Sequence, residues 1–99
     1  MFGTIGHAQL KSGRRAQLDA LMEEWQQTIR PQIPGAFVQL TGHADGQPEA
    51  LVFVALAQDK ATYQTLAAMP AQDAWFRRLA DEVAGEVRWE DVEMEMGPS

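Results

Sequence analysis

The sequence predicts an α+β domain with the element order β-α-β-β-α-β. Two β-like segments flank a turn-rich loop in the middle of the chain, a helical pattern lies on each side of that pair, and strand-like segments begin and end the domain. Two similar halves joined by a hairpin are typical of the ferredoxin-like split βαβ arrangement. Right-handed crossovers then predict a four-stranded antiparallel sheet with the first and third strands in its centre and both helices on one face.

The first half predicts a strand over residues 2–11 and then a helix. Ser12 is the expected N-cap of that helix, and Pro31 followed by Pro34-Gly35 is expected to end it. Between these signals the apolar residues recur at the i, i+3, i+4, i+7 spacing of an amphipathic helix: Leu18, Leu21, Met22, Trp25 and Ile29.

The central stretch, residues 36–57, predicts a hairpin of two unequal strands around the turn at Asp45-Gly46. Side chains alternate between the two faces of a strand, so the first strand has a mixed face with Phe37, Gln39, Thr41 and His43, and an apolar face with Val38 and Leu40. The second strand, Leu51 to Ala57, is apolar on both faces. This pattern is typical of a central strand that is buried on both sides.

The second half predicts helical segments and a last strand. Asp59 is the expected cap of the next helix, and Pro70 either kinks that helix or splits it. A further amphipathic run carries Trp75, Phe76, Leu79 and Val83, with Gly85 as the expected C-terminal cap. The last strand is expected over residues 87–96. We therefore expect a single domain over residues 1–96 and an unordered tail over residues 97–99.

The doubly apolar strand also predicts a partner. Two helices shield only one face of the sheet, and rows of Leu, Phe or Val left in water would form a larger patch than monomers usually tolerate. A second copy packed face to face is the simplest cover, and a symmetric dimer is the commonest form of it. We therefore expect a homodimer that associates through the open face of the sheet.

Composition excludes several classes of function. The 99 residues suit one domain, and eight basic against fourteen acidic residues give a net charge of −6, which disfavours nucleic-acid binding. The chain has no cysteine, which removes disulfides, thiolate nucleophiles and cysteine-based metal sites. No apolar run approaches the ~20 residues that span a membrane, and the start lacks the features of a secretory signal. A soluble cytoplasmic protein without membrane contacts is expected.

The chain resembles the dimeric α+β-barrel superfamily and, within it, the antibiotic biosynthesis monooxygenase-like (ABM) domains. The resemblance covers nearly the whole chain: GTIGHAQLKSG in the first strand, LTGHADGQPEALVFVALAQDKATYQTL from hairpin to helix, and AWFRRLADEV before the last strand. It implies that two subunits close their sheets into a barrel. It also implies a small-molecule pocket between the sheet and the helices of each subunit.

The sequence departs from this family at two places. Members commonly carry a Trp where the third strand meets the second helix, but here that region is Leu56-Ala57-Gln58-Asp59. A His often follows in the helix, where this chain has Tyr63 and Gln64. The haem-degrading branch of the fold uses an Asn and an axial His, and this chain contains no Asn and no His in its second helix. Haem degradation is therefore not predicted.

His7 is the candidate general base, because it lies on the first strand and an imidazole exchanges protons near neutrality. It shares a strand face with Ile5 and Gln9. The alternative is a hydrogen-bonded histidine in the interior or at an interface. His43, beside the hairpin turn, is expected to be exposed.

The candidate substrate-binding residues are polar or aromatic side chains on the strands and helices around the expected pocket: Gln39, Thr41, Tyr63, Trp75 and Arg77. Aromatic walls with a few polar groups suit a flat organic ligand. Arg77 either binds an anionic or phenolic oxygen or pairs with an acid along its helix. Trp25 and Phe76 are expected in the core, and Trp89 is expected at the subunit interface.

Two functions from different classes remain open. One is a cofactor-free monooxygenase that acts on a small phenolic or quinol-type compound, as the resemblance implies. The other is a non-catalytic homodimeric module that binds a small molecule or serves as an accessory domain. No cofactor is expected, and no metal site either, since the sequence has no recognisable ligand spacing.

Overall fold

Four strands form one antiparallel sheet in the order β2-β3-β1-β4. The computed structural model describes residues 1–97. Its elements, in chain order, are β1 (Phe2–Leu10), α1 (Arg15–Thr28), the short 3-10 helix η1 (Arg30–Gln32), β2 (Phe37–Ala44), β3 (Gln47–Ala57), α2 (Lys60–Ala67), α3 (Pro70–Ala80) and β4 (Val83–Glu93). The predicted α+β ferredoxin-like fold is confirmed, with the first and third strands in the centre of the sheet.

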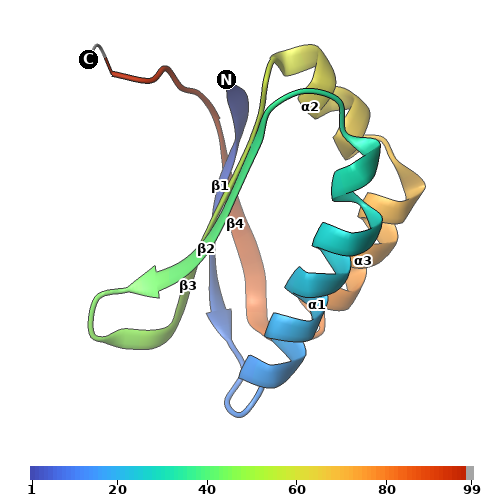
Figure 1. Cartoon of the computed structure of the whole chain (residues 1–99). Coiled ribbons are helices and arrows are strands. Elements are labelled where there is room, and N and C mark those ends of the chain that lie inside the picture. Colours follow the sequence, from blue (N-terminus) through green and yellow to red (C-terminus); the bar gives the residue numbers. More distant parts are fainter. Residues whose placement is uncertain (98–99) are drawn as a thin grey trace.

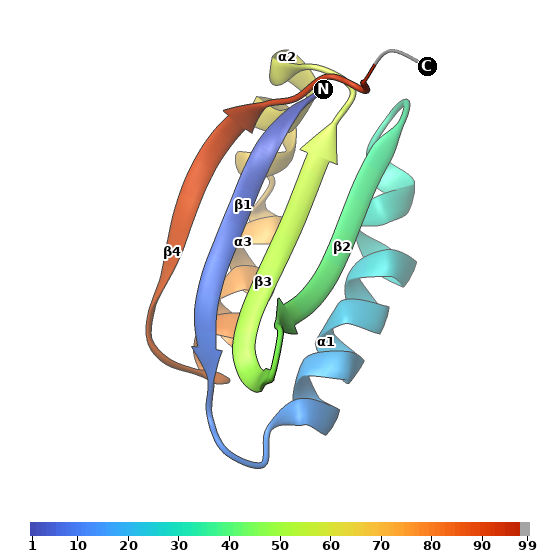
Figure 2. The same ribbon diagram turned by 90° about the vertical axis from the view of Figure 1, so that its left-hand side faces the viewer.

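The helices cover only one face of the sheet. Figure 1 shows α1, α2 and α3 on the same side of the four strands, and Figure 2 shows the opposite face with no helix in front of it. The molecule is therefore a two-layer structure in which alternate residues of each strand face either the helices or the open side.

The strand register aligns residues into rows that cross the whole sheet. One row that faces the helices runs Gln39, Ala55, Thr4, Asp91, and the next runs Thr41, Phe53, Gly6, Trp89. The intervening rows face the open side: Leu40, Val54, Ile5, Glu90, and then Gly42, Val52, His7, Arg88. The assignment of faces predicted for β2 and β3 agrees with this register.

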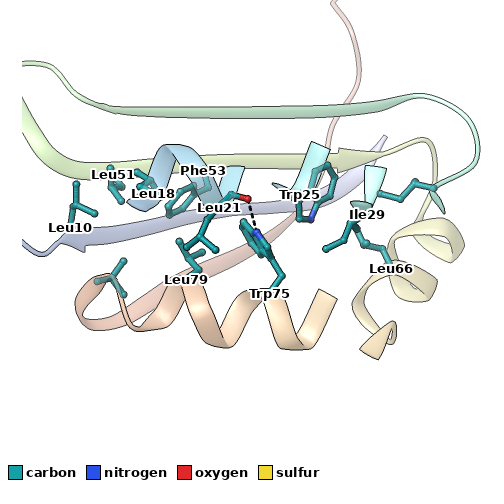
Figure 3. Close-up of a cluster of buried hydrophobic side chains, with 12 residues drawn as sticks. Leu10, Leu18, Leu21, Trp25, Ile29, Leu51, Phe53, Leu66, Trp75 and Leu79 are labelled. Carbon is teal, nitrogen blue, oxygen red and sulfur yellow. Dashed lines mark hydrogen bonds between the residues drawn. The ribbon is translucent and has the colours of Figure 1, made fainter. Parts of the chain in front are cut away.

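The hydrophobic core lies between the sheet and the helices (Figure 3). It joins residues of α1, β3 and α3, among them Leu18, Leu51 and Leu79, all of which are almost fully buried. The Nε1 atom of Trp75 donates a hydrogen bond of 2.7 Å to the backbone carbonyl of Leu21, which ties α3 to α1. A buried indole normally finds such an acceptor, and this bond fixes the ring between the two layers.

The start of α1 corrects the prediction of Ser12 as its cap. The helix begins at Arg15 after Arg14, which makes no side-chain capping bond, because the backbone turns first at Gly13 with a φ of 76°. By contrast, Asp59 caps α2 as predicted: its Oδ1 accepts a 2.8 Å bond from the backbone N–H of Thr62. That hydrogen bond lowers the pKa of the Asp59 carboxyl.

Pro70 splits the predicted second helix into two. It occupies the first turn of α3, and Met69 before it is extended with a ψ of 128°, as the residue before a proline favours. Gly85 as a helix cap was wrong, since α3 ends at Ala80 and Gly85 lies inside β4 with a φ of 76°.

The last strand ends at Glu93 rather than at residue 96. Of the tail predicted to be unordered, Pro98 and Ser99 lie outside the described residues. Within residues 1–97, no helix is both long enough and apolar enough to cross a membrane.

Candidate functional site

A cavity of about 370 Å³ lies between the helix-facing side of the sheet and the three helices. Its walls are mainly aromatic: Trp25, Phe53, Tyr63, Trp75, Phe76 and Trp89. The polar side chains that line it are Thr4, Gln39, Gln72, Asp73 and Asp91. Cavities of this size with apolar walls and a few polar groups are typical of sites for small organic molecules.

The cavity exists because small side chains occupy the middle of the sheet. In the row that runs from Gln39 to Asp91, the two central strands contribute only Ala55 and Thr4. In the next row, β1 contributes Gly6, and a Cβ atom there would lie 2.4 Å from the indole of Trp89. Because Gly6 has no side chain, the indole of Trp89 can lie across β1. The side of the cavity formed by the sheet therefore contains few bulky side chains.

Trp89 forms part of the cavity wall, which corrects the expectation that it lies at a subunit interface on the open face. Its ring centroid is 6.3 Å from that of Phe53 and 5.6 Å from that of Phe76. The side chain is nevertheless 40% exposed, so one side of the wall meets solvent. This part of the wall lies at the β4 edge of the sheet.

A polar group marks the β4 end of the cavity. The hydroxyl of Tyr63, from α2, donates to Oδ1 of Asp91 on β4 over 3.3 Å. Burial raises the pKa of the Tyr63 phenol, and the negative charge of Asp91 raises it further. Thr4 lies beside Asp91 in the same row, and its hydroxyl donates to the backbone carbonyl of Glu90 over 3.1 Å.

Two amide side chains mark the opposite part of the cavity, under α1. Oε1 of Gln39 accepts a 3.0 Å bond from Gln26, and Oε1 of Gln72 accepts a 2.7 Å bond from Nε1 of Trp25. The oxygens of both amides are thus engaged in these bonds. Their N–H groups are the donors left to face a ligand, apart from a 3.6 Å contact between Nε2 of Gln39 and the sulfur of Met22.

Three of the five predicted substrate-binding residues lie together at this cavity: Gln39, Tyr63 and Trp75. Thr41 faces the same side of the sheet, but it lies outside the cavity wall, with its hydroxyl 3.6 Å from the sulfur of Met22. Arg77 also lies outside: it pairs with Asp73 at 3.1 Å, and its side chain is 78% exposed. Whether any of these residues binds a substrate stays a prediction.

His7 lies on the other side of the sheet. It faces the open side between Val52 of β3 and Arg88 of β4, which are its cross-strand partners. The backbone of the sheet thus separates its imidazole from Trp75 and the cavity. The geometry does not support His7 as a base for a ligand bound among the aromatic walls of its own subunit.

Sequence reasoning missed Thr4 and Asp91. The acids of the last strand are typical of a solvent-exposed edge, and a single Thr within a strand carries no signal of a site. A signal was present, because Asp91 lies two residues after Trp89. The two side chains therefore share one face of the strand, and an aromatic beside a carboxylate on one face suggests a site. Among residues 1–97, no group of three or more His, Asp or Glu side chains is arranged to hold a metal ion.

No protein-family model matches the chain, and no curated protein matches it. Solved structures do resemble it. A conserved protein from Methanosarcina mazei has a TM-score of 0.82 at 12% identity, over 95% of this chain and 92% of the other. A candidate antibiotic biosynthesis monooxygenase from Deinococcus radiodurans has a TM-score of 0.80 at 18% identity, over 100% of this chain and 97% of the other.

A second candidate antibiotic biosynthesis monooxygenase, from Nitrosomonas europaea, has a TM-score of 0.76 at 17% identity. It is matched over 95% of this chain and 98% of its own. Identities this low carry the fold and not the chemistry. The chain therefore has the ferredoxin-like fold of the proteins named as antibiotic biosynthesis monooxygenases, as the resemblance in its sequence predicted.

Proposed function

We propose that this protein binds a small, flat, phenolic or quinol-type compound in the cavity between its sheet and helices and acts on it as a cofactor-independent monooxygenase. The observation that carries the proposal is the aromatic cavity of about 370 Å³ with polar groups at its ends. The names of the similar structures from Deinococcus radiodurans and Nitrosomonas europaea point to the same reaction class.

The proposed reaction needs no cofactor because the substrate supplies all the electrons. Removing a proton from an activated CH₂ group beside a phenolic ring gives an electron-rich anion that reduces O₂ directly. One oxygen atom enters the product as a carbonyl and the other leaves as water, so that R₂CH₂ and O₂ give R₂C=O and H₂O. The protein binds and orients the substrate and accepts the proton.

The alternative is a non-catalytic module that binds a small molecule in the same cavity. The position of His7 favours it, because the cavity then lacks the only imidazole predicted to act as a base. The ionisable side chains of the cavity are two carboxylates and a phenol whose pKa is raised rather than lowered. These groups are sufficient to bind a ligand. If the protein is an enzyme, its base must be the carboxylate of Asp73 or Asp91.

One experiment separates these functions. Quenching of tryptophan fluorescence by a hydroquinone and by an anthrone measures binding, and an oxygen electrode measures turnover of the anthrone, which carries the required CH₂ group. We expect Ala55→Leu, which places bulk on the cavity floor, to weaken binding by at least tenfold. Ala74→Leu makes the same change on the exposed side of α3 and should bind as the unaltered protein does.

Oxygen uptake that Ala55→Leu abolishes supports the monooxygenase. Binding without oxygen uptake supports the module. Equal binding by Ala55→Leu and the unaltered protein would contradict the cavity as the site.

We also propose that two copies associate through the open face of the sheet. Ile5, Val54 and Leu40 form one row of that face, and Leu40 is 61% exposed. Val38, Val52 and Val92, each partly exposed, extend this aliphatic surface across all four strands. Burying such a surface against a second copy removes apolar area from water on both subunits.

Light scattering at micromolar concentration tests the dimer. We expect the mass of a dimer for the unaltered protein and of a monomer for Leu40→Glu, since the new carboxylate would lie in an apolar interface. Ala71→Glu adds the same charge on α3 and should remain dimeric. A monomer for the unaltered protein would contradict the proposal. The cytoplasmic location stays a prediction, which fractionation of producing cells would test.

A further inference from the structure

We propose that Asp91, held in place by Tyr63, accepts a hydrogen bond from a hydroxyl group of the ligand and so makes the cavity selective for neutral hydroxylated aromatics over aromatic carboxylates. This inference rests on the proposed function, because it requires the cavity to be the binding site. It assigns the ligand-recognising role to a residue that the sequence did not single out.

The geometry at the β4 end leaves acceptors facing the cavity. The Tyr63 hydroxyl uses its proton on Oδ1 of Asp91. Among the hydrogen bonds of residues 1–97, none engages Oδ2 of Asp91, and an ionised carboxylate only accepts. The Thr4 hydroxyl likewise uses its proton on the Glu90 carbonyl. A ligand that reaches this end must therefore supply the proton of the hydrogen bond.

The charges around the cavity disfavour an anionic ligand. The charged side chains in its lining are the carboxylates of Asp73 and Asp91, and within the described part of the chain no Lys, Arg or His lines it. Neither arginine of α3 lines the cavity, since Arg77 neutralises Asp73 from outside the wall and Arg78 pairs with Glu24. A carboxylate ligand would lose water without gaining a countercharge and would face Asp91.

The far end of the cavity adds a preference for a ligand oxygen. Gln39 and Asp91 stand on the two outer strands of one row, three strand spacings or roughly 14 Å apart. The oxygen atoms of Gln39 and Gln72 are already bonded, so their N–H groups favour a ligand oxygen there. An aromatic with a hydroxyl at one end and an oxygen at the other matches both ends.

The test compares 2-naphthol, which is neutral at pH 7, with 2-naphthoate, which has the same rings and a carboxylate. Isothermal titration and fluorescence quenching give the two dissociation constants. We expect the protein to bind 2-naphthol at least tenfold more tightly. Asp91→Asn, which keeps the shape of the side chain, should reduce this preference to less than threefold. Asp19→Asn, which removes a carboxylate from the exposed side of α1, should preserve it.

The outcomes separate this inference from the proposed function. If both probes bind equally and Ala55→Leu weakens both, the cavity is the site and the selectivity of Asp91 is wrong. A preference that survives in Asp91→Asn, with unfolding in urea unchanged, also overturns the inference. If neither probe binds, both the inference and the proposed cavity fail.

Discussion

The two faces of the sheet are built from the same strands and have different surroundings. On β3, Leu51 and Phe53 face the helices and are 1% and 6% exposed, whereas Val52 and Val54 face the open side and are only partly buried. The helix-facing rows combine aromatic, small and polar side chains, and the open rows combine aliphatic side chains with His7, Arg88 and Glu90. Apolar residues of β3 therefore form part of the core and the cavity wall on one face. On the other face they form an uncovered surface.

The largest expected effect on stability comes from truncating neighbouring residues of β3 that face opposite sides of the sheet. Leu51→Ala should lower the free energy of unfolding by about 2–5 kcal/mol, because it leaves a cavity in the core. Val52→Ala should lower it by less than about 1 kcal/mol in the monomer, since Val52 lacks a covering layer. Urea unfolding followed by circular dichroism measures both values.

Protein concentration distinguishes two origins of any larger loss in Val52→Ala. A loss that grows as the protein is concentrated indicates that Val52 is covered by a second copy. A large loss at every concentration would contradict the view that the open face contributes little to the fold of one subunit.

Two glycines on opposite faces provide the next comparison. Gly6→Ala should destabilise the protein by about 1–3 kcal/mol, because the new Cβ would lie 2.4 Å from the Trp89 ring and the indole must move. Gly42→Ala on β2 meets no atom within 4 Å on the open side. It should be neutral or stabilising by about 0.4–1 kcal/mol, through the entropy of the unfolded chain.

Thermal unfolding and the fluorescence of the tryptophans check this pair. A shift in emission should accompany Gly6→Ala and not Gly42→Ala. Equal stability of the two variants would show that Trp89 does not depend on the bare backbone of β1.

The fold could be predicted because its signals are local and periodic. The alternation along Leu51 to Ala57 and the helical spacing from Leu18 to Ile29 each specify an element, and chain connectivity then restricts their order. Element ends were less secure. Ser12 failed as a cap because Gly13 turns the chain first, and Gly85 failed because a positive φ suits an irregular strand as well as a helix end.

The candidate site could be predicted only in part. Gln39, Tyr63 and Trp75 lie at the cavity. They could be proposed from sequence because they are polar or aromatic side chains on elements that border the expected pocket. Thr4 and Asp91 were missed because the cavity row depends on the register between three pairs of strands, which no local pattern specifies. His7 was assigned to a pocket because alternation groups it with its strand neighbours without showing which face the helices cover.

The smallest effect concerns the polar end of the cavity, where Tyr63 acts as a built-in probe. It is the only tyrosine of the chain, so the ultraviolet absorbance of phenolate reports on this side chain alone. Burial first and the charge of Asp91 second hold its pKa above the ordinary value of 10.0. The unfolded chain then loses this proton before the folded one does, so stability should fall as the pH rises above about 10 toward the folded pKa. Asp91→Asn should lower the titration midpoint by removing the charge while leaving it above 10.0, since the burial remains. A midpoint at or below that value in the unaltered protein would mean that water solvates the phenol freely, and the helix-facing side would then have no partly buried polar group to set against the open face.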